Sequence, residues 1–386
     1  MQTYMIGFTV SRNGREAEIR CPCKESDISR VQDKLEIPYE TDTRVKVIGV
    51  DSDIEQLSVL EGQETDLDYL NLLARIMDGM DSHEYEQFRM GLYHESFTDL
   101  KSIVNVAMTP NRYSIIDPDD LHGSGLDHEF DLRGGIPKSE VDITDYSIIG
   151  RQLIDSGKCE KTPYGLLYLN EEIPLDDFFD GKHMPPYFDC QFQAAVSLHN
   201  DTDADFIFLP CTDAELQRSA KRLGTSFPYD LTVRIEDTPF HTNDLVYGLM
   251  KKADVYTLNQ FARLIDRFDE EKKEKFLAVL DYVNRTFRDT GGLGSLDAAT
   301  KIGGILHAFT FYPNALSDYE LGHSVINERV FDEDLEEYFD FDRYGEDIRK
   351  KENGIFTNDG YIGLNDGNAL RQALTQKNDQ GMGEIT

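Results

Sequence analysis

The sequence has little positive charge and no tryptophan. Its 386 residues include 73 Asp and Glu but only 39 Lys and Arg, so the formal net charge is −34 at pH 7. A protein this acidic repels nucleic acids and anionic membranes and attracts basic surfaces. We therefore expect no direct binding to nucleic acid and no binding to membranes. A surface that is acidic only for solubility is the alternative interpretation of the charge.

Long apolar runs and a cysteine framework are also absent. No stretch approaches the roughly 18 apolar residues of a membrane-spanning helix, and residues 1–4 lack the basic start of a signal peptide. The five cysteines form an odd, scattered set: Cys21, Cys23, Cys159, Cys190 and Cys211. Such a set suits a reducing compartment without disulfides. We expect a cytoplasmic protein.

An internal repeat organises what is present. Residues 70–81 and 258–269 share one pattern at an offset of 188 residues. In both copies apolar residues recur at i, i+3, i+4 and i+7, which predicts an amphipathic helix. Each copy ends in an aspartate suited to cap a following helix, Asp81 in the first and Asp269 in the second.

The repeat extends through most of the chain. The offset of 188 holds from Cys23 and Cys211 onward, and it becomes 195 for the pairs Gly150 with Gly345 and Gly165 with Gly360. A glycine-rich insertion at residues 289–295 explains the shift. The repeat predicts two tandem units of one fold. Their boundaries are 1–170 for the first unit, 171–190 for a linker, 191–365 for the second unit and 366–386 for a frayed polar tail.

Each unit has the pattern of an α+β fold with a small β-sheet, a helical middle and a small terminal α+β piece. In the first unit a hairpin is expected around Asn13-Gly14. The other expected elements are helices at 24–35, 53–60, 67–78, 82–92, 97–107 and 144–154, and strands at 44–50 and 165–169. Glycines at 123–125 and 134–137 predict a linker between them.

The sequence contains no credible catalytic or metal-binding motif. It has no phosphate-binding loop and no nucleophile elbow. Cys21 and Cys23 are too closely spaced for a usual zinc site, and Cys23 and Cys211 are expected in the core. His122 and His128 can in principle hold a metal, but the second unit offers only His323 near the matching place. We expect no enzyme activity, no cofactor and no metal.

The acidic residues recur in small clusters separated by apolar residues. Like charges held apart on a folded scaffold resemble the phosphates of a duplex, which carries one charge per about 1.7 Å of axis. The candidate partner-binding carboxylates are Asp51, Asp53, Glu55, Asp66, Asp68, Asp78, Asp81, Glu84, Glu86, Asp117, Asp119, Asp120, Asp266, Asp269, Glu270, Glu271, Asp332, Glu333, Asp334, Glu336, Glu337, Asp340 and Asp342. We expect them on a continuous exposed face, although any single cluster can simply be solvated.

Residues 337–348, followed by 354–357 and 360–361, resemble the C-terminal motif of ArdA antirestriction proteins. The first unit is more divergent, because it keeps Asp145 and Gly150 but has Arg151 where the second unit has Glu346. The resemblance implies an elongated, acidic protein that mimics bent B-form DNA. Such a protein occupies the DNA-binding groove of type I restriction-modification enzymes without catalysis of its own.

The resemblance leaves two questions open. The family usually has one unit per chain and pairs two chains, whereas two units are expected here, so both an intramolecular pseudo-dimer and a homodimer fit. The alternative function is an acidic binding module for another basic protein that binds nucleic acid, such as a nucleoid protein or a CRISPR effector. Partners recovered with the chain would separate the two functions, and a deep polar pocket would instead favour an enzyme.

Overall fold

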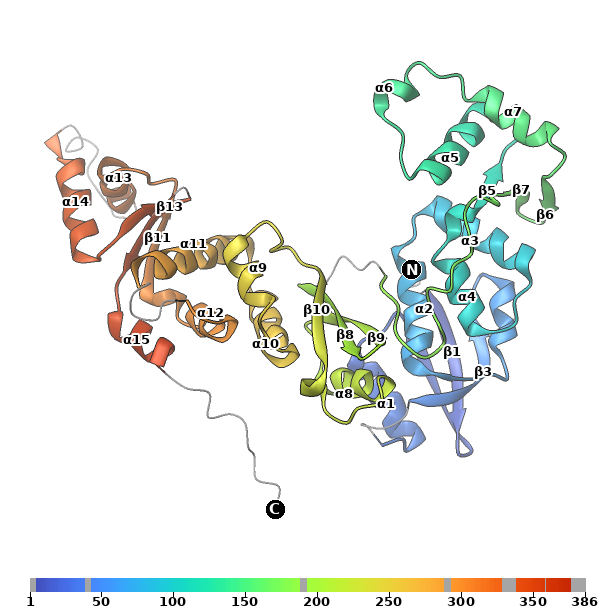
Figure 1. Cartoon of the computed structure of the whole chain (residues 1–386), viewed down its shortest axis with the longest axis horizontal. Helices are drawn as coiled ribbons and strands as arrows, with labels where there is room; N and C mark the ends of the chain where they lie inside the picture. Colours follow the sequence, from blue (N-terminus) through green and yellow to red (C-terminus); the bar gives the residue numbers. More distant parts are fainter. Residues whose placement is uncertain are drawn as a thin grey trace. The chain divides into compact units, whose positions relative to one another are not determined.

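The computed structural model describes residues 5–38, 43–187, 193–287, 293–327, 338–357 and 359–375. The protein is α+β, as predicted, and its chain divides into two compact units (Figure 1). Unit 1 consists of Met1–Gln191, Ser197–Ile207 and Cys211–Leu231, and unit 2 of Phe192–Val196, Phe208–Pro210 and Thr232–Thr386. These units follow from packing, whereas the boundaries at 170 and 191 follow from the repeat and stay a prediction. None of the described helices has the length and apolar character needed to cross a bilayer.

Unit 1 begins with a four-stranded antiparallel sheet of order β2-β1-β3-β4. Its strands are β1 (Ile6–Arg12), β2 (Arg15–Cys21), β3 (Arg44–Asp51) and β4 (Glu64–Asp66). The predicted hairpin is confirmed, because Asn13 and Gly14 both take the positive φ that a tight turn between β1 and β2 requires. Helix α1 (Glu25–Leu35) packs on this sheet and buries Ile28, Val31 and Leu35.

The helical middle of unit 1 consists of η1 (Glu55–Leu60), α2 (Leu67–Gly79), α3 (Ser82–Glu95) and α4 (Leu100–Ala107). All four helices were predicted, and α4 begins three residues later than expected because Asp99 caps it. The apolar face of α2, Leu70, Leu73, Ala74 and Met77, is completely buried. Helix α2 therefore forms the centre of this core.

The terminal piece of unit 1 corrects one prediction. It contains η2 (Pro110–Arg112), β5 (Tyr113–Ile116), α5 (Leu121–Arg133), α6 (Lys138–Val141), α7 (Ser147–Asp155), β6 (Glu160–Thr162) and β7 (Gly165–Leu169). The glycines at 123–125 lie inside α5, so the linker expected there is wrong. Gly125 and Gly150 instead let α5 and α7 pack closely (Figure 1), since a Cβ at Gly125 would overlap the carbonyl oxygen of Tyr146.

The predicted linker after residue 170 is ordered against the helical middle. The Phe179 side chain is buried and its ring meets that of Tyr69 edge to face, with 5.0 Å between centroids. Asn105 accepts a hydrogen bond from the backbone of Phe179 at 2.7 Å and donates one to its carbonyl oxygen at 3.0 Å. These contacts fix the path of the chain into the next segment.

The next segment forms a three-stranded sheet of order β10-β8-β9 with one covering helix. The elements are β8 (Ala194–Asn200), β9 (Asp203–Leu209), α8 (Asp213–Arg222), η3 (Pro228–Asp230) and β10 (Thr232–Asp237). Cys23 and Cys211, expected to be core residues, are both buried. Helix α8 starts with a capping box between Thr212 and Glu215.

Unit 2 continues with a helical middle and a terminal piece. The middle contains α9 (Asp244–Met250), α10 (Val255–Ile265), α11 (Glu270–Thr286) and α12 (Leu296–Gly303). The terminal piece contains η5 (Leu306–Ala308), β11 (Phe309–Pro313), α13 (Asp318–Asn327), α14 (Phe341–Lys351), β12 (Ile355–Thr357), β13 (Gly360–Leu364) and α15 (Gly367–Thr375). Helix α15 buries Leu370 and Ala373, so the expectation of a frayed tail is wrong for 367–375. Residues 376–386, and 289–292 of the predicted insertion, lie outside the described part.

Element order and sheet order recur along the chain. The order β2-β1-β3 in the first sheet corresponds to β9-β8-β10, and β5-β7-β6 corresponds to β11-β13-β12. Single contacts recur as well: Asn170 donates to the Ser114 hydroxyl at 2.8 Å, and Asn365 donates to that of Thr310 at 2.7 Å. Gly322 and Gly345 allow α13 to approach α14 as Gly125 and Gly150 do for α5 and α7.

Candidate acidic binding surface

Tyr85 joins two acidic clusters that lie apart in the sequence. Its hydroxyl donates a hydrogen bond to Asp53 Oδ1 at 2.6 Å. Burial, this hydrogen bond and the negative charges of Asp53 and Glu86 raise the pKa of Tyr85. The segment after β3 and the first turns of α3 thus form one surface. We call its carboxylates the first acidic corner: Asp51, Asp53, Glu55, Asp78, Asp81, Glu84 and Glu86, of which Glu84 and Glu86 are half-buried and the others exposed.

Helix capping holds two carboxylates of the first acidic corner, Asp81 and Glu84, in place. Asp81 Oδ1 accepts the backbone N–H groups of His83 at 2.7 Å and Glu84 at 2.9 Å. Glu84 Oε2 accepts the backbone N–H of Asp81 at 2.9 Å, which completes a capping box. The predicted cap at Asp81 is therefore confirmed. A negative charge at a helix N-terminus is also stabilised by the helix dipole.

Corresponding carboxylates lie between α10 and α11. We call Asp266, Asp269, Glu270 and Glu271, all exposed, the second acidic corner. Asp269 Oδ1 accepts the backbone N–H of Lys272 at 2.8 Å, which confirms the predicted cap and lowers the pKa of Asp269. Lysines balance part of this charge, because Lys273 Nζ lies 2.8 Å from Glu270 Oε1 and Lys272 Nζ lies 3.5 Å from Asp269 Oδ2.

The remaining predicted carboxylates fall at two helix starts or outside the described residues. Asp117, Asp119 and Asp120 are exposed, and Asp120 caps α5 through the backbone N–H of Gly123. Asp340 and Asp342 are exposed, and Asp340 caps α14. The densest acidic run lies outside the described residues: Asp332, Glu333, Asp334, Glu336 and Glu337.

Asp66 and Asp68 correct the expectation that all these carboxylates are exposed. Asp68 is 8% exposed and Asp66 is partly buried. Asp66 caps α2 by accepting the backbone N–H of Asp68 at 2.9 Å, and it also accepts the Thr43 hydroxyl. Asp66 and Asp68 alternate with apolar residues in the sequence, which suggested an exposed face. In the structure, α8 covers the N-terminal end of α2, where both aspartates lie. Asp68 is therefore not available to an external partner in this arrangement, and Asp66 is only partly so.

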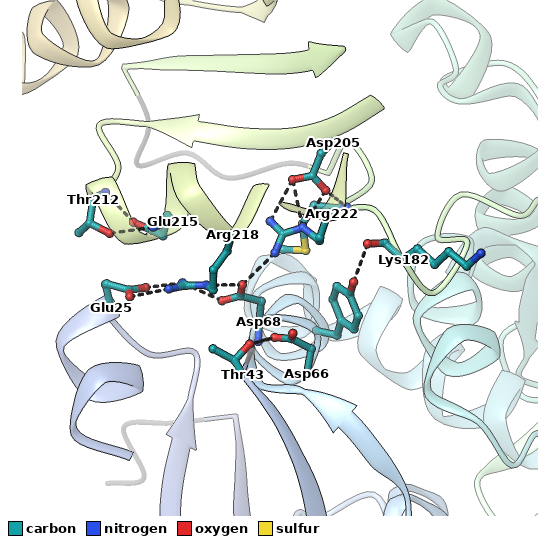
Figure 2. Close-up of polar contacts among 12 residues, drawn as sticks. Glu25, Thr43, Asp66, Asp68, Lys182, Asp205, Thr212, Glu215, Arg218 and Arg222 are labelled. Atoms are coloured by element: carbon teal, nitrogen blue, oxygen red, sulfur yellow. Dashed lines mark hydrogen bonds and ion pairs between the residues drawn. The ribbon is translucent and has the colours of Figure 1, made fainter. Parts of the chain in front are cut away.

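Two arginines of α8 pair with Asp68 within unit 1 (Figure 2). The Arg218 guanidinium makes two hydrogen bonds to Glu25, of 2.9 and 2.7 Å, and two to Asp68, of 2.8 and 3.0 Å. Arg222 bonds to Asp68 Oδ2 at 3.0 Å and to both oxygens of Asp205. We call Glu25, Asp68, Asp205, Arg218 and Arg222 the buried charge network.

The network stays charged although it is buried. Burial disfavours the charge on Arg218, but the carboxylates of Asp68 and Glu25 outweigh it and raise the pKa of Arg218. Burial likewise opposes the ionised form of Asp68, yet Arg218 and Arg222 lower its pKa. Asp66 has no such partner, and burial together with the charge of Asp68 raises its pKa to about 6. Removing one partner from such a buried pair is costly, because it leaves a buried charge uncompensated.

The roles of Arg218, Arg222 and Asp205 were not predicted from the sequence. Arg218 and Arg222 stand four positions apart, so they share one face of α8, and a basic pair on one face usually indicates a solvated surface. Asp205 lies in β9, where a hairpin turn was expected, and it is completely buried. A buried acid in a strand, followed by an Arg pair on the next helix, is the signal that would have suggested an internal ion pair.

A second polar cluster lies where α3 meets the terminal piece of unit 1. Asp131 accepts hydrogen bonds from Gln87 at 2.8 Å and from the Ser114 hydroxyl at 3.2 Å. The Ser114 oxygen also lies 3.1 Å from Nδ1 of His128, one of the two histidines considered as metal ligands. Burial raises the pKa of Asp131 to about 6. Among the described residues, no three His, Cys, Asp or Glu side chains come close enough together to hold a metal ion.

Part of the chain matches a known protein family. No curated protein matches the chain. Residues 202–363 match the model of the family described as Antirestriction protein (ArdA). The matched segment contains the second acidic corner and the whole motif at 337–361, whereas residues 1–201, with the first acidic corner, lie outside it. The resemblance to ArdA antirestriction proteins is therefore confirmed for residues 202–363.

Proposed function

We propose that this chain is an antirestriction protein that acts as a DNA mimic, without catalysis, on type I restriction-modification enzymes. The observation that carries the proposal is the family match of residues 202–363. The geometry supports it, since the two acidic corners and the caps of α5 and α14 hold exposed carboxylates at helix starts. Helix caps limit how far some of these carboxylates move, as a mimic of fixed phosphates requires. The capping residues are Asp81, Glu84, Asp120, Asp269 and Asp340.

The mechanism is replacement of phosphates in a basic groove. Lys and Arg side chains that bind phosphate also bind carboxylate, and Arg can do so with two parallel hydrogen bonds. Each exposed ion pair contributes only about 0.2–1 kcal/mol, so inhibition is the sum of many contacts. The contributing residues are those of the two acidic corners, together with Asp117, Asp119, Asp120, Asp332, Glu333, Asp334, Glu336, Glu337, Asp340 and Asp342.

The proposal includes two ArdA-like units in one chain. What supports it is the recurrence of element order, sheet order and single hydrogen bonds between residues 6–169 and 194–364. Two units in one chain allow an intramolecular pseudo-dimer, so a second chain is not required. Light scattering of the purified chain would distinguish this arrangement from a homodimer.

A DNA-displacement assay with a purified type I enzyme tests the function. We expect the chain to compete with a fluorescent DNA duplex and to lose affinity as salt rises, with roughly 10³-fold between 50 and 200 mM as the DNA-like limit. Plating of unmodified phage on a type I restricting host should rise when the chain is expressed. If the enzyme keeps its DNA while a nucleoid protein or CRISPR effector releases it, the chain is instead a module for that partner. Turnover of any DNA or nucleotide substrate by the chain would contradict the proposal.

A further inference from the structure

The buried charge network combines residues from both sides of the predicted linker. Glu25 and Asp68 precede it, whereas Asp205, Arg218 and Arg222 follow it. All five belong to unit 1 by packing. Arg218 is 4% exposed and Asp205 is completely buried, so this is an internal contact and not a surface ion pair. The repeat would assign its two arginines to the other copy of the fold.

Helix α2 connects this network to the first acidic corner. Asp68 lies in the first turn of α2, and Asp66 caps that turn. The helix ends at Gly79, and Asp81 caps α3 two residues later. An α-helix is stiff and rises about 1.5 Å per residue, so a displacement of its first turn is passed to its last. Tyr69 adds a second attachment at the same end, because its hydroxyl donates to the carbonyl oxygen of Lys182 at 2.5 Å.

We propose that Arg218 and Arg222 are positioning residues for the first acidic corner, which they hold in place through α2. This inference rests on the proposed function, because it assigns a role in inhibition to residues that touch no partner. Without the two guanidinium groups, the carboxylates of Glu25, Asp68 and Asp205 lose their counter-charges in a buried site. Their mutual repulsion, with that of Asp66 beside them, displaces the first turn of α2 and with it the corner.

The test uses the full chain carrying R218Q and R222Q together. Arg349→Gln is the matched control, because Arg349 makes a similar two-bond pair with Asp318, at 2.7 and 2.9 Å, in unit 2. Amide hydrogen exchange is measured for residues 78–86 and for the corresponding residues 266–274. DNA displacement from a type I enzyme is measured on the same samples, well below their unfolding temperatures.

We expect amides 78–86 of the double variant to exchange at least tenfold faster while amides 266–274 keep their protection. Inhibition should weaken roughly tenfold or more, and the Arg349→Gln control should inhibit as well as the wild type. Uniformly faster exchange along the chain would overturn the inference, since it would show a loss of stability and not of position. Unchanged exchange at 78–86 would overturn it as well.

Lysine variants keep the test valid if the double glutamine variant does not fold. Arg218→Lys retains the charge but cannot form two parallel hydrogen bonds to each carboxylate. It should show the same local change at 78–86 with a smaller amplitude, and an unchanged profile would contradict the inference. A wild-type chain that displaces no DNA would refute the proposed function, while the exchange measurement would still decide whether the arginines position the corner.

Discussion

The helical middles of the two halves share their element pattern but not their charge. Residues 51–100 contain thirteen Asp and Glu against two Lys and Arg, whereas the corresponding residues 239–288 contain eight against nine. The helices themselves agree, since α2 and α3 correspond to α10 and α11, and both pairs are joined at a capping aspartate. Apolar positions recur at the offset of 188 residues, and so do a few acids such as Asp78 with Asp266 and Asp81 with Asp269, but the lysines Lys272, Lys273 and Lys275 have no basic counterparts in the first half.

The comparison shows that the shared helices do not require a shared surface charge. The family match covers the nearly neutral middle and leaves the strongly acidic one outside. The matched segment therefore does not include the half with the larger excess of acidic residues. If inhibition depends on carboxylates, the first acidic corner should contribute more than the second, although only the second lies in the matched segment.

Neutralising each corner should give the largest difference between the halves. Five changes to Asn or Gln at Asp51, Asp53, Asp81, Glu84 and Glu86 should weaken inhibition roughly 5- to 5,000-fold, because each lost contact is worth about 0.2–1 kcal/mol. The matched set of changes, at Asp266, Asp269, Glu270, Glu271 and Glu274, should weaken inhibition less than about tenfold. The measurement is DNA displacement at two salt concentrations, and the first set should also flatten the salt dependence.

Stability controls belong to the same experiment. Asn caps a helix about as well as Asp, so the changes at Asp81 and Asp269 should leave α3 and α11 folded, as far-UV circular dichroism can check. An equal loss of inhibition for the two sets would contradict the expected difference between the corners, because the second corner would then bind as strongly as the first despite its lysines.

Glycine substitutions should show where the halves behave alike. Gly150→Leu and Gly345→Leu each place a side chain against a carbonyl oxygen of the helix crossing, that of Leu121 or Asp318. Each should lower the free energy of unfolding by roughly 1–3 kcal/mol, the usual cost of overpacking. Chemical denaturation measures both, with Gly79→Ala as the control because a Cβ there meets nothing within 4 Å. A large cost in one half only would mean that the crossings are not equivalent.

The sequence predicts features that depend on neighbouring residues, but it does not predict contacts between residues far apart in the chain. The Asn13-Gly14 turn and the caps at Asp81 and Asp269 depend on neighbours within four residues, and all three are confirmed. The glycines of α5 were misread because a close helix crossing and a flexible linker use the same residue type. The pair between Arg218 and Asp68 spans 150 residues, so no local pattern indicates it.

A pH-dependent effect is expected in unit 1 from Asp131. Its pKa rises from 3.8 to about 6 on folding, so the folded state binds this proton more tightly than the unfolded state. The contribution of this proton to the free energy of unfolding is complete below pH 3.8 and is lost as the pH rises through about 6. Asp131→Asn should therefore flatten the wild-type decline in unfolding free energy across this range.

The variant should also be more stable than the wild type at pH 7. The buried Gln87 Oε1 has no hydrogen-bond partner among the described residues, and the new amide can donate to it. Denaturation of both proteins at pH 4, 5, 6 and 7 checks the sign. Asp66, whose pKa is raised similarly, is unchanged in both proteins and cancels in the difference. A variant that is less stable at pH 7 would show that the ionised carboxylate is needed.

Neutralising single carboxylates should have the smallest effects on inhibition. These effects should still show that the first acidic corner contributes more than the second. Asp53→Asn removes a charge but keeps the oxygen that accepts from Tyr85, so it should weaken inhibition only about two- to fivefold, as for one exposed ion pair. Glu270→Gln removes a charge that Lys273 already balances in part, so its effect should stay below about twofold. Competition titrations of both variants against labelled DNA measure the ranking. One single change that abolished inhibition would indicate a hot spot, and inhibition by distributed carboxylates would then be wrong for this chain.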